Sequence, residues 1–207
     1  MFNDSDDIFK VLRDKVRTLF TDIQKEFTYL YSDDEHYIKM RLPVKYIEKD
    51  TIPELRNAVK NLDIKPEIHV ADKSEINDLN NIYHQSWIAS DLPMKGVTQE
   101  LIRDIFNDKN TRFLIAQIEN KNVGFILVEF DKKNEDIGII SGIGILPEHQ
   151  SLGLGKFLAL QSWKFFKEKN VKTLQCEVYE KNVKGIKFIK SLGFQEYGEK
   201  EDRSLLK

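Results

Sequence analysis

The sequence predicts a mixed α/β fold of the α+β kind, in which antiparallel strands precede a strand, a glycine-rich turn and a covering helix. Three observations lead to this prediction. The apolar segment 137–145 runs through Pro147 into the loop 150–156, which opens a strongly apolar helix. Alternating, β-rich patterns form two hairpins around that region, and another strand pattern, 173–179, follows the helix. A doubly wound nucleotide-binding fold would instead alternate strands and helices from its start.

The composition is that of an ordinary globular chain. Its 207 residues are 41% hydrophobic and 32% charged, with a formal net charge of −2, so bulk charge gives no reason to expect nucleic acid or an anionic membrane as partner. No run of about 18 apolar residues is present and the first residues are acidic, so we expect a cytosolic chain without a signal peptide. The single cysteine, Cys176, lies mid-strand and is expected to be a buried packing residue.

Residues 1–65 are expected to form a small α-β-β-α extension. Apolar residues recur at helical spacing over 8–23. The segments 27–31 and 37–42 alternate, are rich in β-forming residues and flank a turn-forming stretch, so they predict a hairpin.

The second helix of this extension is expected to begin with Asp50 or Thr51 as its cap and Pro53 in its first turn. The whole piece is too small to be stable alone. We therefore expect it to pack on the domain formed by 66–207, or on a second subunit of a homodimer. The alternative is that it forms part of a substrate site or recognises a partner.

The domain expected at 66–207 begins with a short strand and two helices. Asp72 and Glu75 have the spacing of a capping box before the first helix. Pro93 and Gly96 interrupt the helical pattern between the two helices, and Thr98 is expected to cap the second one.

The loop between the apolar strand and its helix is a predicted phosphate site, because a helix start offers unpaired amides and the positive end of the helix dipole. It is not a Walker A loop, since Gln150 stands five places before Gly155 and Lys156 is followed by Phe157. It is not a dinucleotide fingerprint either, since Leu158 occupies the place of the third small residue. A nucleotide triphosphatase and a Rossmann enzyme are thus disfavoured.

Two signatures instead resemble those of the GCN5-related N-acetyltransferases. The first is the loop pattern Gln150-x-x-Gly153-x-Gly155. The second lies about twenty residues on and consists of a strand ending in Glu-Val, an asparagine, a short helix and a Gly-Phe pair, here Glu177-Val178, Asn182 and Gly193-Phe194. The resemblance covers roughly 66–207 and implies an acyl-CoA N-acyltransferase fold, with a mixed central sheet whose parallel strands splay.

Strands 137–145 and 173–179 are expected to be parallel, because a helical crossover connects them. Glycine weakens a strand interior, so Gly142 and Gly144 predict a bulge or the close approach of another extended group. Splayed strand ends could pair with the amide-bearing arm of coenzyme A.

The resemblance implies acetyl-CoA as cofactor, with its diphosphate on the loop amides and its arm along the strand. Asn182 is either a helix cap or a residue beside the cofactor, and Phe188 is expected to line the channel. The expected cofactor-binding residues are Ile143, Gly144, Ile145, Gln150, Ser151, Leu152, Gly153, Leu154, Gly155, Lys156, Asn182 and Phe188.

Three residues are expected to carry the chemistry. The amide of Ile143 is aimed at the thioester carbonyl, and Glu177 is a candidate base acting through water, with a surface or capping role as the alternative. Tyr179 is a candidate acid, because Ile189 stands where many relatives have a tyrosine. Relatives also place a glutamate where Ile139 stands here. The other acids near the hairpins are poorer candidates for the base: Glu129, Glu135 and Asp136.

The segment between the first two helices of the domain is expected to cover the acceptor pocket, with His84, Trp87, Asp91 and Met94 as candidate substrate contacts. No Ser/His or Cys/His pair suggests a covalent intermediate, and no metal site is expected. The sequence therefore predicts direct acetyl transfer from acetyl-CoA to a small-molecule or peptide amine. The alternatives are a non-catalytic acyl-CoA-binding module and an interaction scaffold with a vestigial cleft.

Overall fold

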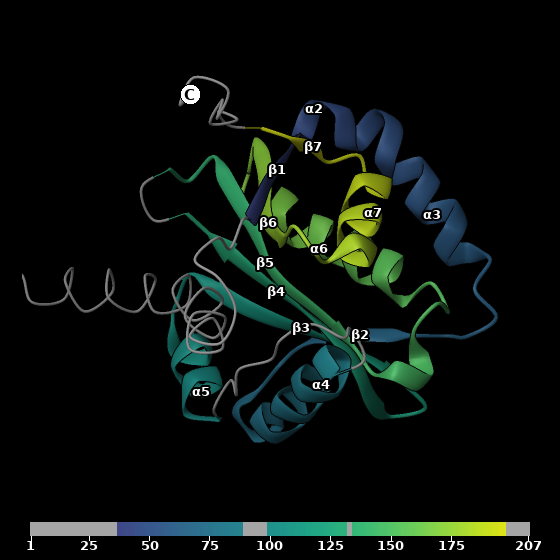
Figure 1. Ribbon diagram of the computed structural model, residues 1–207, viewed down its shortest axis with the longest axis vertical. Helices are drawn as coiled ribbons and strands as arrows, with labels where there is room; N and C mark the ends of the chain where they lie inside the picture. The colour runs from purple at the N-terminus through teal and green to yellow at the C-terminus, as the bar shows by residue number, and fades with distance from the viewer. Residues whose placement is uncertain (1–36, 89–98, 132–133, 198–207) are drawn as a thin grey trace, which may run out of the picture.

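One mixed β-sheet organises the part of the chain that the computed structural model describes, residues 37–88, 99–131 and 134–197 (Figure 1). Within these residues the sheet has seven strands in the order β2-β3-β4-β5-β6-β1-β7. The strands are β1 (Tyr37–Pro43), β2 (Glu67–Val70), β3 (Thr111–Ile118), β4 (Lys121–Phe130), β5 (Ile137–Ile145), β6 (Thr173–Tyr179) and β7 (Gln195–Glu196). Every neighbouring pair is antiparallel except β5 and β6, which are parallel as the sequence predicts.

Helices cover both faces of this sheet. On one face lie α3 (Ile52–Lys60), α6 (Leu154–Glu168) and α7 (Val183–Ser191); on the other lie α4 (Ile76–Ile88) and α5 (Gln99–Asn107) (Figure 1). Short turns of helix precede some of these elements, namely α2 (Val44–Tyr46), the π turn Ile47–Thr51 and the 3-10 turns Lys73–Glu75 and Pro147–His149.

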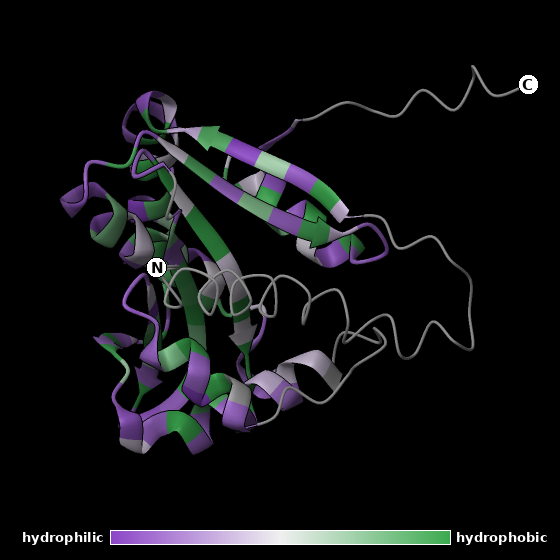
Figure 2. Cartoon of the chain, turned by 90° about the vertical axis from the view of Figure 1, so that its left-hand side faces the viewer, coloured by the Kyte–Doolittle hydropathy of each residue, from purple (hydrophilic) through white to green (hydrophobic). Residues whose placement is uncertain are grey.

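Each face of the sheet has its own hydrophobic core. Met40, Leu158 and Phe166 are fully buried on the α6 face, and Leu79 and Ile115 are buried on the α4 face. The central strands are the most hydrophobic elements, whereas the helices mix hydrophobic and hydrophilic residues (Figure 2). This pattern is expected for a sheet that is buried on both sides. Among the described helices, none combines the length and the apolar character that a membrane crossing requires.

Local sequence signals account for several element boundaries. Asp72 and Glu75 form the predicted capping box before α4. The β3–β4 hairpin turns at Glu119 and Asn120, both with positive φ (50° and 61°), which is the geometry of a two-residue type I′ turn.

Strand β1 lies between β6 and β7 in the sheet. The predicted strand at 37–42 is confirmed, but it pairs along its length with β6, and Met40 sits opposite both Cys176 and Glu196. The proposed partner segment 27–31 and the helix over 8–23 lie outside the described residues. Both β1 and α3 precede residue 66, yet they share the sheet and the core of the residues that follow it.

The expected helix cap at Asp50 or Thr51 is wrong. The chain becomes helical at Val44, directly after β1 ends at Pro43, and continues through the π turn into α3. Thr51 therefore has helical backbone angles (φ −75°, ψ −44°), and its hydroxyl donates to the carbonyl of Leu192 at 3.3 Å. A residue already inside a helix cannot have the extended backbone of an N-cap.

The position of β1 in the core predicts the effect of trimming its inward face. Replacing Met40, which is 0% exposed, with alanine should lower the free energy of unfolding by about 2–5 kcal/mol, because a buried methionine is lost and leaves a cavity. Urea denaturation measures this change. The matched control is Lys39→Ala on the exposed face of the same strand, which should change stability by less than about 0.5 kcal/mol. Equal effects of the two variants would contradict the placement of β1.

Candidate active site

The parallel strands β5 and β6 pair over a short stretch and then diverge. Their residues pair only from Ile137 opposite Thr173 to Ile139 opposite Gln175. Beyond this point β5 stays paired with β4 as far as Ile145, and β6 stays paired with β1 as far as Tyr179. We call the two unpaired edges, 140–145 and 176–179, the strand fork. They carry backbone groups with no partner strand among the described residues.

A β-bulge explains why β5 leaves β6. Val128 sits opposite Ile140 and Leu127 opposite Gly142, so Ser141 is an extra residue in β5. Such a bulge bends its strand and interrupts the ladder. The Ser141 hydroxyl donates a hydrogen bond to the Glu129 carboxylate at 3.1 Å. The bulge predicted from the glycines is therefore present beside Gly142.

The ladder between β4 and β5 decides which amides face the fork. The Leu146 amide donates to the Val123 carbonyl, and hydrogen-bonded pairs alternate along an antiparallel ladder. Gly144 and Gly142 thus bond to β4, whereas the backbone groups of Ile145 and Ile143 point away from it, into the fork. The Ile145 carbonyl accepts from Gln150 Nε2 at 3.0 Å. The Ile143 amide has no such partner among the described residues.

The same alternation applies on the other side of the fork. The Val44 amide donates to the Lys172 carbonyl, so the backbone groups of Glu177 and Tyr179 point away from β1 and toward β5. Sequence reasoning considered only the side chains of these two residues. Their backbone role depends on the antiparallel partner on their outer side, which no local pattern reveals.

Gly144 lies where helix α4 packs on the sheet. A Cβ atom here would lie 2.6 Å from the Phe125 ring and 2.9 Å from the Ser86 hydroxyl. Glycine at 144 therefore allows α4 to pack closely against β5. The close approach that the structure shows at this position is that of a helix on the sheet face.

The loop after β5 opens α6 without a capping side chain. Gly153, its N-cap residue, has φ 86°, a left-handed conformation that favours glycine. The amides of Leu154, Gly155 and Lys156 lie in the first helical turn, where no intrahelical acceptor exists. They add to the positive end of the helix dipole. Lys156 is exposed beside them.

Two neighbours hold this loop in place. A Cβ on Gly153 would lie 2.4 Å from Leu62, which follows α3, and a Cβ on Gly155 would lie 2.9 Å from the Phe188 ring of α7. Phe188 therefore packs against the first turn of α6. Sequence reasoning missed Leu62, because no local signal shows that its segment returns to the loop.

Glu177 and Tyr179 lie on the sheet face opposite α6, because the alternate residues Cys176 and Val178 are buried in the α6 core. Glu177 is exposed and lies directly opposite Lys39 in the β1–β6 ladder. Tyr179 is 7% exposed. Its ring packs against Tyr37 with 5.7 Å between centroids.

Asn182 is a helix cap, one of the two alternatives that the sequence leaves open. Its Oδ1 accepts from the Gly185 amide at 2.8 Å at the start of α7. Ile189 is buried at 6% exposure, so this position belongs to the core and supplies no group to the fork.

The candidate substrate residues lie only partly within the described chain. His84 and Trp87 are half-buried on α4, where Trp87 stacks on Tyr83 at 5.8 Å and His84 meets the edge of the same ring at 5.8 Å. Burial raises the pKa of the Tyr83 hydroxyl. Asp91 and Met94 lie outside the described residues. The helix carrying His84 and Trp87 contacts Gly144 of β5 through Ser86.

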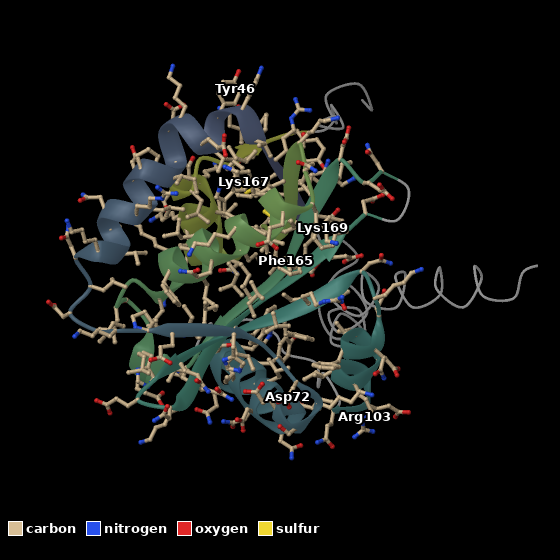
Figure 3. All side chains as sticks on the ribbon, turned by 180° about the vertical axis from the view of Figure 1, so that it is seen from behind. Tyr46, Asp72, Arg103, Phe165, Lys167 and Lys169 are labelled. Atoms are coloured by element: carbon tan, nitrogen blue, oxygen red, sulfur yellow. The ribbon has the colours of Figure 1, made fainter. Side chains whose placement is uncertain are left out.

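A cavity of about 270 Å³ lies elsewhere, between the start of α4 and α5. Its lining includes Lys73 and Arg103 and none of the predicted site residues. Figure 3 shows Arg103 and Asp72 on the side of the sheet away from Lys167 of α6. Among the described residues, no group of His, Cys, Asp and Glu side chains is arranged to hold a metal ion.

A mixed sheet whose single parallel pair divides beside a glycine-rich helix start defines the acetyltransferase class of α/β folds. In agreement, the model of the Acetyltransferase (GNAT) family matches residues 76–194. That match covers more than half of the chain, which therefore belongs to this family.

Solved structures share this fold at low sequence identity. The ribosomal-protein-S18-alanine N-acetyltransferase from Escherichia coli is 19% identical, with a TM-score of 0.55 over 65% of this chain and 80% of its own. The protein AAC(6')-Iy, in complex with the bisubstrate analog CoA-S-monomethyl-acetylneamine, is 19% identical, with a TM-score of 0.51 over 65% of this chain and 94% of its own.

A functionally unknown conserved protein from Staphylococcus epidermidis matches 91% of this chain and 64% of its own length, at 16% identity and a TM-score of 0.56. Its match extends well beyond the segment 76–194. The likeness to such a protein indicates that the fold, including residues before the family segment, is shared.

The conformation of Gly153 predicts that a branched residue there disrupts the loop. Gly153→Val places a Cβ at φ 86° and against Leu62, which strains the backbone by about 1–3 kcal/mol. We expect coenzyme A affinity to fall about ten-fold or more, measured by isothermal titration calorimetry. The matched control is Leu152→Ala, which removes an exposed side chain but keeps the amide, and it should bind normally. Unchanged affinity of Gly153→Val would show that the loop does not hold the cofactor.

The burial of Cys176 predicts an unreactive thiol. Burial, with a smaller contribution from the Glu177 carboxylate, raises the pKa of Cys176 from its ordinary value of 9.0 to about 12. A thiol reagent at pH 8 should modify the urea-unfolded chain rapidly and the native chain only at the rate of unfolding, since the thiolate is the nucleophile. Fast modification of the native chain would contradict this.

The same shift gives a pH dependence of stability. The folded thiol binds its proton more tightly than the unfolded one, so its stabilising effect is fully present below about pH 9 and is lost as the pH rises toward 12. Cys176→Ala should lack this part of the pH dependence when urea unfolding is compared at pH 8 and pH 10.

Proposed function

We propose that this chain is an acetyl-CoA-dependent N-acetyltransferase that moves an acetyl group to a primary amine by direct attack. The observation that carries the proposal is the strand fork, whose two edges begin directly after the last common pair, Ile139 and Gln175. The β5 edge leads through the loop after it to the first turn of α6, which has no capping side chain. Membership of the family supports the same activity. The enzyme named AAC(6')-Iy, which shares the fold, has been crystallised with a bisubstrate analog that contains coenzyme A.

The residues present fit the cofactor. The amides of 151–156 and the Lys156 side chain would hold the diphosphate, because this helix start has no capping side chain. Gln150 keeps the loop against β5 through the Ile145 carbonyl. The backbone edges of Ile143 and Glu177 would hold the amide-bearing arm as an added strand. Phe188 would form the wall behind Gly155.

Acetyl-CoA, when bound, supplies the acetyl group as a thioester. The Ile143 amide would polarise its carbonyl, because the ladder directs this N–H into the fork. Asn182 would act indirectly, since its Oδ1 is occupied in capping α7. Gly144 would serve the packing of α4.

Proton transfer is the second requirement. An amine with a pKa near 10 must lose a proton at pH 7, which costs about 4 kcal/mol for roughly 3 pH units, so a base should lower this cost. Glu177 and Tyr179 point to the sheet face opposite α6, on the same side as α4 with His84 and Trp87. Glu177 is the base that the sequence suggests, acting through water, and Tyr179 would be the acid for the leaving thiolate.

The acceptor is proposed to be a small-molecule or peptide amine. The aromatic group formed by Tyr83, His84 and Trp87 on α4 supports this, because aromatic faces attract ammonium groups. Asp91 and Met94 remain candidate contacts from the sequence alone. The family segment is compatible with both acceptor classes, since the S18-alanine enzyme is named for a protein and the AAC(6')-Iy complex contains an aminoglycoside-type analog.

The alternative is a non-catalytic acyl-CoA-binding module. One observation favours it, namely that Ile189 is a core residue at the position where many relatives carry a tyrosine. The leaving thiolate has a pKa near 8.5 by the cysteine reference, so its late protonation costs little near neutral pH. The absence of that tyrosine is therefore weak evidence for a non-catalytic module.

Two measurements test the proposal. Acetyl-CoA should raise the melting temperature of the protein, and thiol release should be observed with at least one member of a panel of amino acids, peptides, polyamines and aminoglycosides. Binding without turnover on the whole panel would favour the binding module. The absence of a thermal shift would contradict both and leave an interaction scaffold.

A further inference from the structure

We propose that Glu129, positioned by Ser141, is the base that takes the proton from the acceptor amine, in preference to Glu177. This inference rests on the proposed acetyltransferase function and assigns a further residue to the same site. The sequence gives Glu129 little weight, because it lies on β4 and far from the loop. The pairing of β4 with β5 places Glu129 beside the strand that leads to the loop.

The first argument is position. Glu129 lies directly opposite Ile139, and Ile139 lies directly opposite Gln175, in the last row in which β5 and β6 still pair. Directly opposite residues share a face of the sheet. Glu129 is thus on the face that also carries Glu177, two residues past Gln175, and it stands at the closed end of the fork.

The second argument is the hydrogen bond from Ser141. The bulge makes Ser141 an extra residue, and its hydroxyl reaches Glu129 Oε2 at 3.1 Å. Ser141 lies two residues before Ile143, roughly 7 Å at about 3.3 Å per residue. The hydrogen bond thereby holds the carboxylate within about two residues of the Ile143 amide, which we propose as the donor to the thioester carbonyl.

The third argument is environment. Glu129 is half-buried between strands, whereas Glu177 is exposed and faces Lys39 across the β1–β6 ladder. A catalytic side chain works best when packing and supporting hydrogen bonds fix its conformation. A carboxylate held by a neighbouring hydroxyl meets that requirement better than an exposed one beside a lysine.

The protons and bonds balance. An ammonium acceptor loses two protons on becoming an amide. Glu129 takes the first, directly or through one water, and releases it to solvent. As the nitrogen–carbon bond forms and the carbon–sulfur bond breaks, the electron pair leaves on sulfur, which gains the second proton from the nitrogen through Tyr179 or water.

The test compares Glu129→Gln, Ser141→Ala and Glu177→Gln with wild type, using coenzyme A affinity and the pH profile of kcat/KM. Glu129→Gln should bind coenzyme A normally and lose about a hundred-fold or more of kcat/KM at pH 7, with recovery at high pH, where the amine loses its own proton. Glu135→Gln, on the exposed turn before β5, is the matched control and should behave as wild type.

Ser141→Ala separates a catalytic role from a purely structural one. A hydroxyl that donates to a carboxylate favours its ionised form, so removing it should move the acid limb of the pH profile to higher pH. A structural role for the pair would lower stability without moving that limb.

Distinct outcomes overturn distinct claims. An unchanged kcat/KM and pH profile in Glu129→Gln would overturn the role of Glu129. A loss of kcat/KM in Glu177→Gln alone would assign the base to Glu177. A wild-type protein that releases no thiol with any amine overturns the proposed function itself, and this inference with it. Circular dichroism of each variant identifies any loss of folding. If Glu129→Gln does not fold, the acid limb of the pH profile of Ser141→Ala decides whether Glu129 is the base.

Discussion

The fork between β5 and β6 stays open because each strand is held on its outer side. Beyond Ile139, β5 continues to pair with β4, and β6 continues to pair with β1. Neither strand can turn toward the other without breaking the ladder on its outer side. The bulge at Ser141 sets the direction in which β5 departs. The unpaired amides of the fork are therefore a consequence of pairing elsewhere in the sheet.

The segment before residue 66 takes part in this arrangement at two places. As β1 it supplies the outer partner of β6, and through Leu62 it contacts Gly153 in the glycine-rich loop. An exposed ion pair between Glu48 and Lys167 at 2.5 Å links the same segment to α6, although such pairs contribute little to stability. One stretch of chain thus braces both the strand edge and the helix start of the candidate site.

Much of the fold can be predicted from local sequence patterns, and what these patterns miss has physical reasons. Periodicity predicts the strands, the covering helix and the parallel pair, and the capping box at Asp72 needs only its own residues. Partners across the sheet are not encoded locally, so neither the pairing of β1 with β6 nor the contact between Glu129 and Ser141 can be predicted from the sequence. The cap prediction at Thr51 fails because a cap depends on whether the preceding residues are already helical. Strand pairing shows where the site residues lie, whereas their chemical roles stay predictions.

The location of β1 also bears on how the chain acquires its structure. Met40 pairs with Cys176 of β6 and with Glu196 of β7, both far from it in the sequence. Contacts this distant in sequence slow folding. On a ribosome, an apolar strand near the beginning of the described chain would remain exposed until nearly all of that chain had emerged. During this interval the strand would be open to wrong pairing with other nascent chains.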